Sequence, residues 1–322
     1  MAADREKRVE GYREASRKAD ELAVGGRRDE ALALLKDTHA AAVEAGDEDY
    51  RLFFEAELAN YQDSDSARAI ELMGAALAWV DEHGLAPDYF LLRNMGVHHS
   101  HKGDLDAAIE WFDKALAANP DDSDAMRSKA VSLSKKGGLN AAFEWFDKAL
   151  AANPDDSDAM RNEGISLSKR GDEDAAIEWY DKALAVNPDD SAAMRNKGIS
   201  LSKKGDEDAA IEWYDKALAA NPNNSDAMRD RGTSLSNKGD EDAAIEWYDK
   251  ALAANPDDFD AMRHKGTSLS LQGKDDEALA IVSKAAQLDA VRSRSDFRQV
   301  CQAALRDPDE EWMKLFPDEG DP

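Results

Sequence analysis

A 34-residue period is the feature that most constrains how this chain can fold. Five prolines and five tryptophans recur at that interval. The prolines are Pro120, Pro154, Pro188, Pro222 and Pro256, and the tryptophans are Trp111, Trp145, Trp179, Trp213 and Trp247. Such a period is typical of an array in which one unit cannot bury its apolar face alone, so that neighbouring units must stack. Six units run from Tyr89 to about Arg292.

Each unit predicts a pair of helices. In the unit that begins at Ser157, the side-chain oxygens of Ser157 and Asp158 are candidate caps for a first helix, and Gly171 ends it. Asp172 is the candidate cap of a second helix, which Pro188 stops. The unit is therefore a helical hairpin.

The same unit also predicts where the two helices meet. Gly164 and Ala176 are small enough to let the helices approach closely. The apolar residues at helical spacing form the expected buried faces. They are Met160, Leu167, Ile177, Tyr180, Ala183 and Leu184.

One glycine and two alanines recur at fixed positions of the second half of the unit. They are Gly103, Gly137, Gly171, Gly205, Gly239 and Gly273, with Ala108, Ala142, Ala176, Ala210, Ala244 and Ala278, and Ala115, Ala149, Ala183, Ala217, Ala251 and Ala285. In this pattern the chain resembles the tetratricopeptide repeat (TPR) family, whose unit is a 34-residue helix-turn-helix. The resemblance covers about two thirds of the chain and implies an all-α, right-handed α-solenoid (superhelix) of helix-turn-helix repeats. The first half of the unit departs more, since methionine replaces the family's usual aromatic residue.

The rest of the chain divides into three parts. Residues 1–88 predict divergent TPR-like hairpins with longer helices, ahead of the six tandem repeats of residues 89–292. Residues 293–306 predict a helix that caps the open end of the array. Residues 307–322 form an acidic tail that is too polar to fold alone, and it either docks on the array or covers the last helix pair.

Charge and composition exclude several classes of function. Lys and Arg number 41 against 68 Asp and Glu, which gives a net charge of −27 and disfavours nucleic-acid binding. No apolar run approaches the ~20 residues of a membrane span. The charged N-terminus predicts no secretory signal, and the single cysteine, Cys301, fits a reducing compartment. We therefore expect a cytoplasmic protein.

Three patterns could carry chemistry, and each has a structural explanation. His98, His99 and His101 could begin a zinc site, but no further ligand is predicted nearby. The Asn-Pro-Asp-Asp turns resemble calcium loops without their spacing, so helix capping explains them better. The tryptophans more simply seal the seams between repeats. The sequence thus predicts no metal, no cofactor and no enzyme.

The family resemblance implies where a ligand would bind. In TPR proteins the first helix of each repeat lines a concave groove. Carried over to this chain, the groove residues are Arg93, Arg127, Arg161, Asn162, Arg195, Asn196, Lys203, Arg229 and Arg263. Guanidinium groups suit carboxylates, and amides hydrogen-bond to an extended backbone, so a basic stripe that binds an acidic segment is expected.

An alternative is that the arginine row is only a neutralised, solvated face. Four of the six arginines follow an aspartate by three residues, a spacing that permits an intrahelical ion pair of about 0.2–0.5 kcal/mol. Ala192 replaces that aspartate before Arg195, so this stretch is expected to be the best anion site of the groove.

The sequence therefore predicts a protein–protein interaction scaffold that binds an extended or acidic peptide segment in the TPR groove. The alternative function is a sensor or regulator whose N-terminal helical region acts on a target in response to a peptide signal. The sequence predicts no oligomeric state.

Overall fold

The computed structural model describes residues 2–24, 27–63 and 65–288, and these residues contain helices and turns but no strand. The chain forms two compact units, residues 1–159 and residues 160–322. The prediction of an all-α repeat fold is confirmed. The predicted capping helix (293–306) and the acidic tail (307–322) lie outside the described residues.

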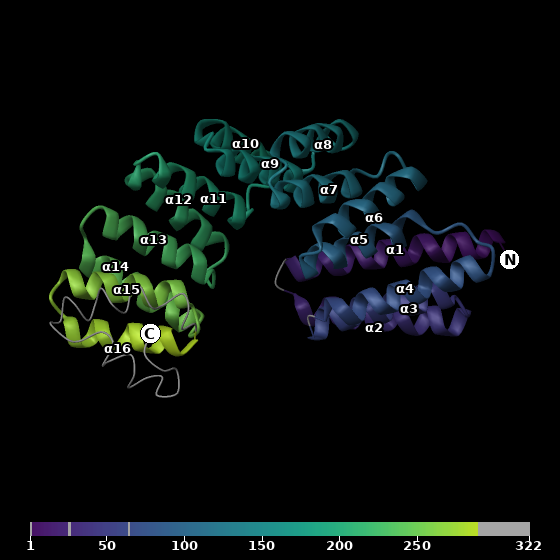
Figure 1. Cartoon of the computed structure of the whole chain (residues 1–322), viewed down its shortest axis with the longest axis horizontal. Coiled ribbons are helices and arrows are strands. Elements are labelled where there is room, and N and C mark those ends of the chain that lie inside the picture. Colours follow the sequence, from purple (N-terminus) through teal and green to yellow (C-terminus); the bar gives the residue numbers. More distant parts are fainter. Residues whose placement is uncertain (1, 25–26, 64, 289–322) are drawn as a thin grey trace, which may run out of the picture. The chain divides into compact units, whose positions relative to one another are not determined.

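Unit 1 consists of consecutive antiparallel helix pairs (purple to teal in Figure 1). Its helices are α1 (Ala2–Val24), α2 (Arg28–Ala45), α3 (Glu48–Asp63), α4 (Ser66–Glu82), α5 (Tyr89–Lys102), α6 (Leu105–Ala118), α7 (Ser123–Lys136) and α8 (Leu139–Ala152). The two helices of each pair pack on one another, and the second helix of the first three pairs also packs on the first helix of the next. This is the arrangement in which each hairpin covers the apolar face of its neighbour.

Unit 2 repeats this arrangement (green to yellow in Figure 1), and α9 (Ser157–Arg170) spans the boundary between the units. Its other helices are α10 (Glu173–Val186), α11 (Ser191–Lys203), α12 (Glu207–Ala220), α13 (Ser225–Asn237), α14 (Glu241–Ala254), α15 (Phe259–Leu271) and α16 (Asp275–Leu288). None of the described helices has the length and apolar character needed to cross a membrane.

Four of the repeats are packed around a glycine that faces an aromatic ring. A β-carbon at Gly164 would lie 2.6 Å from Cε1 of Tyr180, and Gly198 stands in the same relation to Tyr214. Ala176 is completely buried in this contact region. The predicted close approach through Gly164 and Ala176 is therefore confirmed, and its cause is the space that a buried tyrosine ring requires.

In the regular repeats, the residue directly before the first helix is the N-cap, and the sequence revealed the helix ends only in part. Gly171 has a φ of +92°, which confirms that it ends α9. The cap at the other end is Asp156, whose carboxylate accepts a hydrogen bond from the backbone N–H of Ala159 at 2.9 Å. The prediction of a Ser157 or Asp158 cap is wrong, because Ser157 is already the first helical residue.

The N-terminal helices are longer and are packed differently. Helices α1 to α4 have 23, 18, 16 and 17 residues, whereas α5 and α6 have 14 each. Their core is a cluster of buried aromatic rings, in which Phe53 lies 4.9 Å from Phe54 and 5.4 Å from Phe90 between ring centroids. Tyr12 of α1 joins it through Tyr50, 5.1 Å away. Large rings thus pack here together with small buried residues such as Ala31 and Ala69.

Candidate functional site

The arginines of the predicted groove contact the following repeat. Arg93, on α5, places Nη1 3.3 Å from the carboxylate of Asp122 and 3.2 Å from that of Asp124. Asp122 is also the N-cap of α7 and accepts a hydrogen bond from the backbone N–H of Ala125. One carboxylate therefore caps a helix and binds the arginine of the repeat before it.

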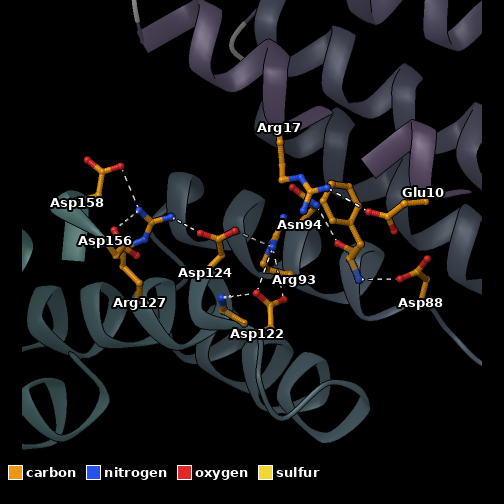
Figure 2. A network of polar contacts seen from close by, with 12 residues as sticks. Glu10, Arg17, Asp88, Arg93, Asn94, Asp122, Asp124, Arg127, Asp156 and Asp158 are labelled. Carbon is orange, nitrogen blue, oxygen red and sulfur yellow. Dashed lines mark hydrogen bonds and ion pairs between the residues drawn. The ribbon is translucent and has the colours of Figure 1, made fainter. Parts of the chain in front are cut away.

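The next repeat of unit 1 has the same contacts. Arg127, on α7, lies 3.3 Å from Asp156 and 3.1 Å from Asp158, and its other terminal nitrogen lies 2.7 Å from Asp124 of its own helix. Figure 2 shows the resulting chain of carboxylates and guanidinium groups. Burial raises the pKa of the Asp156 carboxyl group, although Arg127 opposes the shift.

Unit 2 contains the same inter-repeat contact. Arg161 pairs with Asp190, the cap of α11, and Arg229 lies 2.7 Å from Asp258, the cap of α15. The intrahelical pair predicted from sequence is also present at Arg229, which lies 2.7 Å from Asp226. The arginine row thus links each repeat to the next.

Arg195 was expected to be the least neutralised arginine of the groove, and this expectation is wrong. The cap of the following helix is Asn224 instead of an aspartate, but the missing carboxylate reappears at Asp230, one position after the arginine of that repeat. Nε of Arg195 donates to Asp230 at 2.6 Å. Burial raises the pKa of Asp230, and Arg195 and Arg229 oppose that shift.

Two further predicted groove residues, Lys203 and Arg263, are also engaged. Nζ of Lys203 lies 2.8 Å from Oγ of Ser168 and 3.0 Å from the carboxylate of Glu173. Arg263 lies 2.9 Å from the ring of its neighbour His264 and 3.8 Å from Asp260.

The structure places all nine predicted residues on first helices of repeats. Arg93 is on α5, Arg127 on α7, Arg161 and Asn162 on α9, Arg195, Asn196 and Lys203 on α11, Arg229 on α13 and Arg263 on α15. Each of the six arginines has a carboxylate within 4 Å. The row is therefore paired with carboxylates along its length, and most of these carboxylates belong to the next repeat.

A pocket on unit 1 lies partly outside the predicted row. Its volume is about 1070 Å³, and side chains of α1, α3, α5 and α7 line it, among them Arg17, Glu57, Asn94 and Ser128. Only Ala23 and Val97 contribute apolar side chains to its lining. Sequence reasoning missed α1 and α3 because their residues do not follow the 34-residue period.

The most buried ionisable side chains of this pocket are Glu57 and His98. Their residues are 5% and 1% exposed, and Nε2 of His98 lies 3.2 Å from Oε1 of Glu57. This contact does not have hydrogen-bond geometry, and both ring nitrogens of His98 are buried without a hydrogen-bond partner. The other repeats carry a buried serine at the position of His98, such as Ser132 and Ser200.

The histidine cluster does not converge on a metal site. His98 faces Glu57, while Nδ1 of His99 lies 3.5 Å from Asp104. Within the described ranges, no group of three or more His, Cys, Asp or Glu side chains could hold a metal ion.

The tryptophans are covered by cations. Nζ of Lys129 and Nζ of Lys148 each lie 3.9 Å from the ring centroid of Trp145. Lys197 and Lys216 occupy the same positions at Trp213, at 4.1 and 3.8 Å. These rings are half-buried between lysine side chains, so they stabilise the repeats and do not offer an open stacking surface.

Known proteins share both the sequence pattern and the fold. A tetratricopeptide repeat model matches residues 59–123, 93–157, 128–185 and 161–225, and a second one matches residues 201–264. No curated protein sequence matches the chain.

Three solved structures illustrate the similarity of fold. The APC/C hetero-tetramer Cut9–Hcn1 has a TM-score of 0.68 at 16% identity, covering 88% of this chain and 54% of that one. A tetratricopeptide repeat protein from Parabacteroides merdae has a TM-score of 0.61 at 17% identity, covering 81% and 100%. Pseudomonas aeruginosa pilF has a TM-score of 0.55 at 19% identity, covering 63% and 92%. Because the family models match more than half of its length, the chain belongs to the tetratricopeptide repeat family.

Proposed function

We propose that this protein is a scaffold that binds an extended segment of a partner protein along the first-helix face of its repeats. TPR proteins generally bind other proteins and are generally not enzymes. The observation that carries the proposal is the pocket on unit 1, because most of its lining residues lie on the first helices α1, α3, α5 and α7.

The lining of the pocket suits a polypeptide backbone. Asn60, Ser66, Asn94 and Ser128 supply neutral hydrogen-bonding groups. Asn94 is held in place, since its side-chain N–H donates to the carbonyl oxygen of Phe90 at 2.8 Å. Groups that are fixed before binding lose less conformational entropy when the ligand arrives.

First helices of unit 2 carry residues of the same kind. We keep the nine residues predicted from sequence as proposed contacts, each within its own unit, and we give their arginines a changed role. Because Arg161, Arg195 and Arg229 are held by carboxylates, they present a fixed pattern of donors instead of an unbalanced positive charge. This favours an extended segment of mixed polarity over a strongly acidic one.

One observation supports the sensor function as a second candidate. Arg13 of α1 lies 2.6 Å from Asp88, the cap of α5, and the hydroxyl of Tyr50 donates to the same carboxylate at 2.5 Å. The N-terminal helices are thus tied to the first repeat next to the pocket. Hydrogen exchange in α1 that quickens when a peptide binds would favour a sensor, and unchanged exchange would favour the plain scaffold.

Selection from a phage-displayed library of random peptides tests the proposal. We expect the full chain to enrich peptides whose binding falls about tenfold or more in the variant Ser128→Trp, because the large ring fills the pocket. Ala117→Trp is the matched control, since Ala117 is exposed on the second helix α6 of the same unit. Equal binding by both variants would contradict the proposal.

A further inference from the structure

We infer that the pocket of unit 1 takes a basic side chain, lysine or arginine, from the bound segment and pairs it with Glu57. The inference rests on the proposed function and names the chemistry that this site selects. It reverses the acidic ligand expected from the sequence.

Glu57 is a buried carboxylate without a fixed positive partner. Its side chain is 7% exposed, and its closest basic contact among the described residues is the imidazole of His98, which is charged only when protonated. His101 also interacts with Glu57 electrostatically, but burial lowers the pKa of this second imidazole. A buried carboxylate is costly unless a cation or several hydrogen bonds compensate for its lost hydration. An ammonium or guanidinium group entering from the pocket supplies that compensation.

The arginines near the pocket are already compensated. Arg93 contacts two aspartates and Arg127 contacts three. Figure 2 shows how the carboxylate of Asp124, which contacts both, bridges the two guanidinium groups. Because carboxylates already contact both guanidinium groups, these arginines do not attract a further carboxylate strongly. Arg17 is paired with Glu10 on its own helix at 3.2 Å.

The net negative charge of the whole chain also favours a basic ligand. The net charge of −27 repels an acidic segment and steers a basic one toward the surface. At physiological ionic strength this steering reaches only about 8 Å from exposed charges, so the selection depends on the local carboxylates. Among those that line the pocket, Glu57 is the most deeply buried, and its closest basic contact is the imidazole of His98.

The test compares peptide selection on the full-length protein and on two variants of equal charge. Glu57→Gln removes the buried charge with little change of shape. Glu110→Gln removes one charge from an exposed position of α6 in the same unit and serves as the control for the general field. Far-UV circular dichroism and the thermal midpoint show whether each variant keeps the fold.

We expect the wild-type pool to carry a lysine or arginine at one preferred position, and the same preference to persist with Glu110→Gln. With Glu57→Gln the preference should disappear, and the selected peptides should bind about tenfold or more weakly. A pool rich in Asp and Glu, or a basic preference that survives Glu57→Gln, would overturn the inference and leave the proposed function intact. Failure to enrich any peptide that Ser128→Trp rejects would overturn both.

Discussion

The N-terminal helices and the regular repeats solve the same packing problem in different ways. In α1 to α5 the core is filled by rings that contact one another, with Tyr50, Phe53 and Phe54 all completely buried. In the regular repeats a glycine of one helix receives the ring of the other, as Gly198 receives Tyr214. The first solution depends on a cluster of rings, and the second on a close approach repeated every 34 residues.

The surroundings of the helical glycines differ between the two regions. Gly74 lies within α4, and a β-carbon added there would meet nothing within 4 Å. A β-carbon at Gly198 would meet the Tyr214 ring at 2.6 Å. Glycine therefore makes room for the ring at Gly198, whereas at Gly74 no neighbour requires it. The repeat of α7 and α8 is an exception among the regular repeats, because Ala130 takes the corresponding position beside Phe146.

The largest expected effect is the loss of an aromatic ring from the N-terminal cluster. Phe53→Ala should lower the free energy of unfolding by about 3–5 kcal/mol, since it leaves a cavity among Tyr50, Phe54 and Phe90. Equilibrium urea unfolding followed by circular dichroism measures it. Phe143→Ala in α8 is the comparison, and it should cost less because Phe143 is only partly buried. Equal losses at the two sites would remove the distinction between the regions.

The second prediction uses one substitution in both regions. Gly198→Ala should destabilise the protein by about 1–3 kcal/mol, because the added methyl group displaces the Tyr214 ring. Gly74→Ala should stabilise it by up to about 1 kcal/mol, because alanine is the better helix former and the position is open. Thermal midpoints of the two variants should therefore move in opposite directions. A rise of both midpoints would show that helix propensity outweighs the ring contact at Gly198. A fall of both would contradict the prediction for Gly74.

The third prediction concerns the sign of a pH effect. Burial alone would raise the pKa of Asp47, but hydrogen bonds from Arg8 and Tyr12 bring it below the ordinary value of 3.8. The stability that Asp47 supplies is therefore present above about pH 4 and is lost as the pH falls through its lowered pKa. For Asp230 burial prevails and raises the pKa, so its contribution is present below 3.8 and is lost as the pH rises through the raised value.

Urea unfolding at about pH 3 and pH 7 tests this contrast. Relative to wild type, Asp47→Asn should lose stability mainly at pH 7 and thus show a smaller fall on acidification. Asp230→Asn should show a larger fall on acidification, because it lacks the group that is favoured in acid. Identical pH profiles for the two variants would contradict the opposite pKa shifts of Asp47 and Asp230.

The smallest effect is expected at the exposed pairs between repeats. Lys238 pairs with Asp208 of the preceding repeat, but the two side chains are 40% and 82% exposed. Lys238→Ala should change the free energy of unfolding by less than about 1 kcal/mol, and less still at about 1 M KCl, where the charges are screened. A loss comparable to that of Gly198→Ala would mean that an exposed ion pair between repeats contributes as much as a ring contact within a hairpin.

Much of the fold was readable from the sequence, because its signals are local and repeated. The 34-residue period, the turn glycine at Gly171 and the small Gly164 opposite Tyr180 each describe contacts within one hairpin. A helical hairpin of this kind carries its own caps and its own apolar face, so one unit predicts the next. The cap itself was misplaced by one or two residues, since Asp156, Ser157 and Asp158 all offer oxygens.

The electrostatics of the first-helix face was decided only by the tertiary structure. The sequence showed one arginine per repeat and an aspartate three residues before four of them. It did not show that the principal partners lie 29 to 31 residues later, at the start of the next repeat. Arg195 illustrates the point, because its partner Asp230 becomes a neighbour only when the two repeats stack.

The sequence by itself thus determined the family, the hairpin and the order of the repeats, all of which follow from contacts close in the chain. The tertiary structure decided which charges remain available for a partner. The pocket of unit 1 brings together α1, α3 and α5, and the pair of Glu57 with His98 joins residues 41 positions apart that follow no period. Charge complementarity depends on distances between helices, and those distances exist only after the hairpins have packed.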